Sequence, residues 1–107
     1  MNRVKATERL KMRERAAEEA VEYFCDDEEL KQAAEVAVLL SKYAYMDAAM
    51  RGEISEGFYK ENLDWIKAHK KEYKANRFLT GKLKLYNILC GCGNGGLYKI
   101  FRKIKHE

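Results

Sequence analysis

The fold is decided by the stretch DDEELKQAAEVAVLLSKYAYMDAAMRG, residues 26–52. It opens with four carboxylates, which stabilise the positive end of a helix dipole and can cap exposed backbone N–H groups. It closes at Gly52, a residue type that commonly ends helices in left-handed geometry. Between these signals, apolar residues recur at helical spacing, which predicts one long helix from about Glu28 to Arg51. Its expected inner face consists of Leu30, Ala33, Ala37, Leu40, Ala44 and Asp47, with Val36, Tyr43, Met46 and Met50 beside it.

Helical spacing continues on both sides of this stretch. Residues from Val4 or Thr7 to Phe24 predict a first long helix, because apolar side chains recur on one face and charged ones on the other. After Gly52, Ser55 is the expected cap of a third helix that fades near residues 74–77, with Ile54 and Tyr59 placed to form a hydrophobic staple. We expect Leu40 and Leu63 in the core.

The C-terminal part divides at a run of glycines. A shorter helix should begin at Thr80 or Asn76 and reach Leu89, and residues 91–96 (GCGNGG) then break the pattern. No strand-like alternation occurs, and proline is absent. The sequence therefore predicts an all-α protein, with three main helices in a small bundle and a basic helical C-terminal extension. The expected divisions are a helical domain over 1–90, a glycine-rich hinge over 91–96 and a basic amphipathic tail over 97–107.

Charge is distributed unevenly along the 107 residues. Residues 66–107 hold eleven basic and two acidic side chains, a net charge of +9, whereas residues 1–65 hold ten basic and fifteen acidic ones, a net charge of −5. A basic segment of this kind predicts an anionic partner. No apolar run is long enough to span a bilayer, no secretory signal follows Met1, and the cysteine count is odd. We therefore expect a cytoplasmic protein, with peripheral attachment to the inner membrane as an extension of that prediction.

The tail carries the strongest functional signal. Its apolar residues fall at i, i+3, i+4 and i+7, and basic residues surround them, as in helices that lie in a membrane interface. The predicted membrane-binding or partner-binding residues are Leu97, Lys99, Ile100, Phe101, Arg102, Lys103, Ile104 and Lys105. Two alternatives stay open: the apolar face packs on the domain itself, or the lysines bind nucleic-acid phosphates. No base-reading helix or stacking motif is present, which favours the membrane surface over nucleic acid.

No catalytic, cofactor or metal site can be read from the residues. The carboxylates of residues 26–29 fit a helix start, and Cys90 and Cys92 lack the spacing of zinc ligands. The glycine run lacks the Gly-Lys-Ser/Thr ending of a phosphate-binding loop, and His69 lies in a solvated basic stretch. Asp47, embedded among apolar neighbours, is interpreted as a buried polar partner of a Tyr or Lys side chain.

Several segments together resemble a known family. YFCDDEEL (23–30), KLKLYNILCG (82–91) and GLYKIFRKIK (96–105) look like the C-terminal helical region of bacterial family 2 glycosyltransferases that build surface polysaccharides. The resemblance implies a non-catalytic domain that supports a sugar-transferring catalytic partner domain and docks it at the membrane. The Asp-x-Asp motif of that catalytic domain is missing from this chain, so no catalytic residue can be carried over. The alternative is an independent helical interaction protein that binds nucleic acid or another acidic partner through its tail.

Overall fold

The structure is a computed structural model that describes residues 3–91, 96, 98–100 and 102. Within these residues the chain forms α1 (Arg3–Tyr23), α2 (Glu28–Met50), α3 (Gly57–His69), a short 3₁₀ helix (Lys70–Tyr73) and α4 (Gly81–Cys90). The described residues contain no strand, so the all-α prediction is confirmed.

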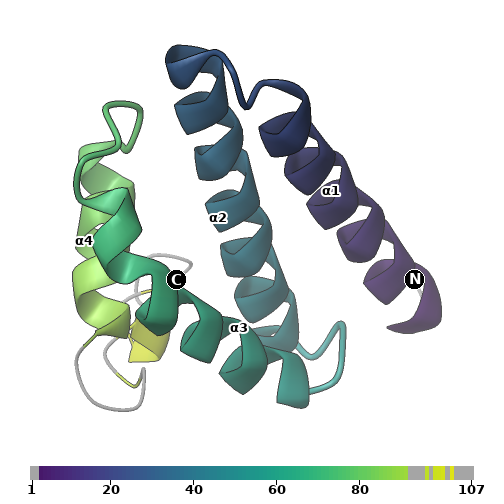
Figure 1. Cartoon of the computed structure of the whole chain (residues 1–107). Coiled ribbons are helices and arrows are strands. Elements are labelled where there is room, and N and C mark those ends of the chain that lie inside the picture. The colour runs from purple at the N-terminus through teal and green to yellow at the C-terminus, as the bar shows by residue number, and fades with distance from the viewer. Residues whose placement is uncertain (1–2, 92–95, 97, 101, 103–107) are drawn as a thin grey trace.

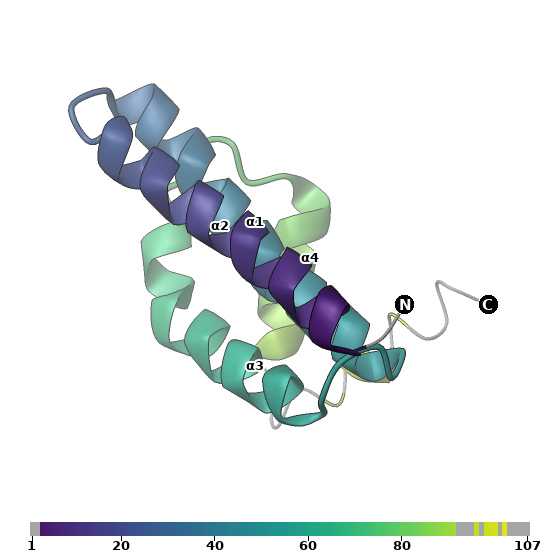
Figure 2. The same cartoon turned by 90° about the vertical axis from the view of Figure 1, so that its right-hand side faces the viewer.

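Helix α2 lies at the centre of the bundle. In Figure 1, α1 runs antiparallel to α2 on one side, and α4 lies on the other side of α2. Figure 2 shows α1 and α2 lying along each other, with α3 and α4 beyond them. Because helices flank α2 on two sides, it buries side chains on two faces.

The core accordingly has two parts. The larger cluster joins α2 to α3 and α4, and its buried residues include Leu39, Tyr43, Met46, Leu63, Ile66, Leu83 and Tyr86. The smaller cluster joins α2 to the α2–α3 connection and to α1 through Tyr45, Ala48, Ala49 and Ile54, with Ala6 and Leu10 against it. Both clusters draw on α2, so this helix positions every other element.

The expected inner face of α2 was wrong by about one residue position. Leu40 is 38% exposed and Leu30 is 45% exposed, whereas Leu39 is 1% exposed. The two flanking helices cover the sides of α2 that carry Leu39 and Tyr45, and the expected stripe falls at the edge between them. Leu63, at 3% exposed, lies in the core as predicted.

Local signals set most helix ends as predicted. Asp27 caps α2 by accepting a hydrogen bond from the Leu30 backbone N–H at 3.2 Å, and Gly52 has a φ of 75°. Thr80 caps α4 through a 3.3 Å bond from the Leu83 N–H to its hydroxyl oxygen. These three signals act within a single turn of the chain.

The start of α3 differs from the expectation. Helix α3 begins at Gly57 without a side-chain cap, so Ser55 is not its cap. Instead, the Ser55 backbone carbonyl accepts a hydrogen bond from the Phe58 N–H at 3.2 Å. The expected apolar contact is present, since Ile54 is 1% exposed and Tyr59 packs against its cluster. A backbone turn thus replaces the predicted hydroxyl cap.

Candidate functional site

In the C-terminal basic segment, which corresponds to the predicted tail, the structure describes residues 98–100 and 102. A carboxylate at the centre of the bundle binds two of these residues. Asp47, on α2, accepts a hydrogen bond from the Tyr98 hydroxyl at 2.9 Å. It also forms a two-pronged ion pair with Arg102, with Nη2 at 2.7 Å from Oδ2 and Nε at 3.2 Å from Oδ1. The Arg102 and Asp47 side chains are only 13% and 16% exposed. Asp47 is therefore the polar partner of a tyrosine, as predicted, and its basic partner is an arginine.

An aromatic cluster surrounds this ion pair. Tyr98 is fully buried, and its ring lies 5.3 Å from that of Tyr43 and 5.4 Å from that of Tyr86. Arg102 Nη1 donates to the Tyr86 hydroxyl at 2.9 Å, and the Tyr43 hydroxyl donates to Asn87 Oδ1. Burial raises the pKa of Tyr43 and of Tyr98 far above the usual value, and the Asp47 carboxylate adds to both effects. These phenols therefore stay protonated and serve as hydrogen-bond donors.

The segment also has exposed side chains, in contrast to the buried Tyr98 and the ion-paired Arg102. Ile100 is 58% exposed, and exposed Lys99 places its Nζ 4.5 Å from the Tyr59 ring centroid. Ile100 is two residues from both Tyr98 and Arg102, which is about 200° around a helix from each of them. The segment therefore contacts the core through Tyr98 and Arg102 and directs Ile100 away from it.

The predicted binding residues divide into three groups. Lys99 and Ile100 are both exposed, with Lys99 lying over the Tyr59 ring, and the core takes up Arg102 through Asp47. The other five, Leu97, Phe101, Lys103, Ile104 and Lys105, lie outside the described residues, as do residues 92–95 of the predicted hinge. The sequence did not identify Tyr98 as a contact residue, because its partner Asp47 lies 51 residues away along the chain.

The thiol at the end of α4 is buried within the core. Cys90 is completely covered, and burial raises its pKa to about 11. A thiol with so high a pKa carries almost no thiolate at neutral pH and is a poor nucleophile or metal ligand. Cys25 is exposed, and Cys92 lies outside the described residues.

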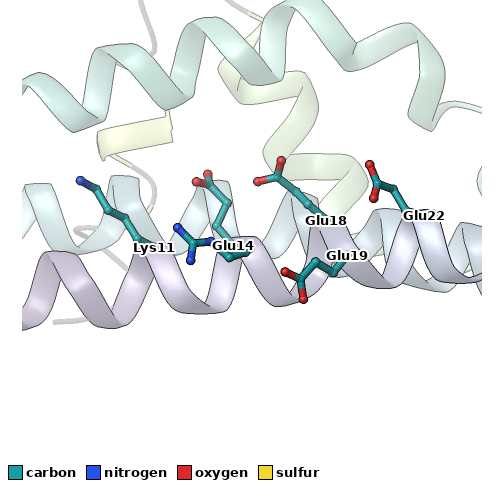
Figure 3. A pocket seen from close by; sticks show the side chains of 6 residues that line it. Lys11, Glu14, Glu18, Glu19 and Glu22 are labelled. Atoms are coloured by element: carbon teal, nitrogen blue, oxygen red, sulfur yellow. The ribbon is translucent and has the colours of Figure 1, made fainter.

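The surface of α1 carries an acidic hollow. It has a volume of about 370 Å³, and Figure 3 shows Glu14, Glu18 and Glu22 on the same side of α1 while Glu19 points away. Carboxylates four residues apart are separated by about 6 Å along the helix axis. Across the described part of the chain, no three His, Cys, Asp or Glu side chains are grouped to hold a metal ion.

A second hollow, of about 170 Å³, adjoins the first between α1, α2 and α3. At its edge, buried Lys42 forms a 2.5 Å ion pair with Glu14, and its Nζ lies 4.7 Å from the Trp65 ring centroid. Trp65 stacks in turn on His69, with ring centroids 3.9 Å apart. Lys42 thereby links all three helices, which is a structural role.

Comparisons with known proteins give no match. No protein-family model matches the chain, and neither a curated protein nor a solved structure is significantly similar to it. Among the residues that the structure describes, no helix is both long and apolar enough to cross a bilayer.

Proposed function

We propose that this chain is a non-catalytic helical domain that binds an anionic membrane surface through its basic C-terminal segment. In this proposal it supports a sugar-transferring catalytic domain at that surface. One observation carries the membrane part: Ile100, from the predicted apolar face, is 58% exposed, while Tyr98 and Arg102 on the opposite side hold the segment to the core.

This arrangement favours the membrane over simple packing. If the apolar face packed on the domain, Ile100 would be covered, as Tyr98 is. A membrane interface would remove Ile100 from water, and each basic side chain near anionic lipid adds about 1 kcal/mol of binding free energy. No Asp or Glu occurs between Glu72 and Glu107, so the segment offers little electrostatic repulsion to lipid phosphates.

The catalytic-partner part rests on the resemblance, and the placement of the resembling segments supports it. Residues 23–30 span the end of α1 and the cap of α2, and residues 82–91 form nearly all of α4. The third segment contributes Tyr98 and Arg102, which bind Asp47. Two of the three resembling segments, residues 82–91 and the C-terminal one, thus contact each other through Tyr86, Tyr98 and Arg102 and help to fix the basic segment relative to the bundle, which a domain that orients a partner at a surface requires.

Co-sedimentation with vesicles tests the membrane part. Wild type should sediment with phosphatidylserine-containing vesicles and stay in solution with phosphatidylcholine alone. Ile100→Asp should weaken binding tenfold or more, because it removes one apolar contact with the membrane and adds a charge that anionic lipid repels. The matched control is Met12→Asp, because Met12 is 72% exposed on α1. Phe101→Asp combined with Ile104→Asp extends the test to the rest of the predicted face.

Two outcomes would contradict the membrane part of the proposal. If wild type does not bind anionic vesicles, the membrane part is refuted. If Ile100→Asp causes a global loss of helicity, seen by circular dichroism, the segment is part of the core.

The nucleic-acid alternative would be favoured if wild type does not bind vesicles but binds short duplex DNA with an affinity that decreases steeply as the salt concentration rises. For the partner part, co-expression with a family 2 catalytic domain should give a stable complex, and its absence would argue against this role.

A further inference from the structure

Helix α4 has an exposed face that the core does not use. Its inner side buries Leu83, Tyr86, Asn87 and Cys90. On the outer side, Leu85 is 40% exposed and Ile88 is 55% exposed, and Lys84, one turn before Ile88, is exposed as well. Two large aliphatic side chains three residues apart on a solvent-facing helix form a continuous apolar stripe with a lysine at its edge.

The charged side chains of α4 itself are all basic. Lys82 and Lys84 are the only charged residues of α4, and residues 73–106 contain no Asp or Glu. By contrast, α1 carries exposed apolar side chains, Val4 and Met12, within a helix that also holds five glutamates. An apolar stripe on a helix whose charged residues are all basic is complementary to a surface with an anionic outer layer above an apolar interior.

The helix that carries the stripe is fastened to the basic segment on its inner side. Tyr86 of α4 receives a hydrogen bond from Arg102 and packs edge-to-face on the Tyr98 ring. The ion pair of Arg102 with Asp47 then ties both to α2. Figure 1 shows α4 at the outer edge of the bundle, on the side of α2 opposite α1. The helix that carries Leu85 and Ile88 is thus fastened to the segment that carries Ile100.

We propose that the outer face of α4 is a second membrane contact, in which Leu85 and Ile88 enter the interface of an anionic bilayer and Lys84 pairs with lipid phosphates. The inference rests on the proposed function, and it assigns to the membrane a surface on the bundle itself. Two contacts on one rigid body would fix the orientation of the domain at the bilayer, whereas the segment alone would act as a tether.

The test uses the whole chain and vesicles of phosphatidylcholine with and without phosphatidylserine. Leu85→Gln combined with Ile88→Gln removes the apolar stripe and leaves the charge unchanged. We expect this variant to bind anionic vesicles about tenfold more weakly than wild type. Lys84→Gln should weaken binding about fivefold. The matched control, Val4→Gln combined with Met12→Gln, removes two apolar residues of α1 that are more exposed than Leu85 and Ile88, and this variant should bind as wild type does.

Other results would overturn the inference. If the Leu85/Ile88 variant binds as tightly as wild type while Ile100→Asp does not bind, the segment alone is the membrane site, and the proposed function survives without the α4 contact. If wild type is a dimer in sedimentation velocity and the variant is a monomer, the stripe is an interface with a second copy. All the substituted side chains are exposed, and unchanged circular dichroism would confirm that the variants are folded.

Discussion

The anchor at Asp47 gives a sharp test of how the C-terminal segment is held. Asp47→Asn keeps the size of the side chain and an oxygen that can accept the Tyr98 hydrogen bond, but it leaves the Arg102 guanidinium without a counter-charge. Removing one partner of a fully buried ion pair costs about 3–5 kcal/mol. Because these side chains are 13% and 16% exposed, we expect a somewhat smaller loss, about 2–4 kcal/mol. For a chain of this size, that loss lowers Tm by about 9–18 °C.

Thermal and urea unfolding followed by circular dichroism would measure this loss. A double-mutant cycle with Arg102→Met isolates the pair, and the coupling free energy between the two positions should be about 1–3 kcal/mol. Glu53→Gln is the matched control, because Glu53 forms an ion pair with Arg51 in which both side chains are about half exposed. That change should alter the free energy of unfolding by less than about 1 kcal/mol. If Asp47→Asn is no more destabilising than Glu53→Gln, or if the cycle is additive, the ion pair does not hold the segment.

The remaining predictions concern the core and its ionisable groups. Leu63→Ala should destabilise the fold by about 2–5 kcal/mol, whereas Leu40→Ala, at a position 38% exposed, should cost less than half as much in urea unfolding; similar losses would contradict the packing. Burial raises the pKa of Tyr45 from 10.0 to about 12 and of Cys90 from 9.0 to about 11. Because both groups stay protonated in the folded state, their stabilising effect is complete below the unfolded pKa and is lost as pH rises toward the folded one. The urea concentration at the midpoint of unfolding should therefore decrease as the pH rises from about 9 to about 12. A midpoint that does not change over this pH range would refute the burial of these groups. In the native state a thiol reagent should modify Cys25 and spare Cys90, as located by peptide mass spectrometry; rapid modification of Cys90 would contradict its placement. The chain alone should transfer no sugar from any nucleotide sugar, and turnover abolished by one point substitution would contradict a non-catalytic role.

The sequence alone was sufficient for the fold class and most helix ends. The signals at Asp27, Gly52 and Thr80 act over at most one turn of helix, so the residues that determine them are neighbours in the sequence. Helical periodicity is equally local, because it depends only on which residues lie three or four positions apart. Ser55 is the exception, since the buried Ile54 beside it belongs to a cluster that α2 completes.

Only the tertiary structure decided which sides of the helices face inward and what holds the C-terminal segment. Periodicity in α2 fits more than one stripe, and the packing of helices on two of its sides selected Leu39 over Leu40. The partners of Asp47 lie 51 and 55 residues along the chain, and no local pattern joins them. The burial of Tyr98 could not be predicted from the sequence, because only the fold brings the Asp47 carboxylate to its hydroxyl. The exposure of Ile100 follows from the same contact, since a helix held through Tyr98 and Arg102 must direct its opposite side to solvent.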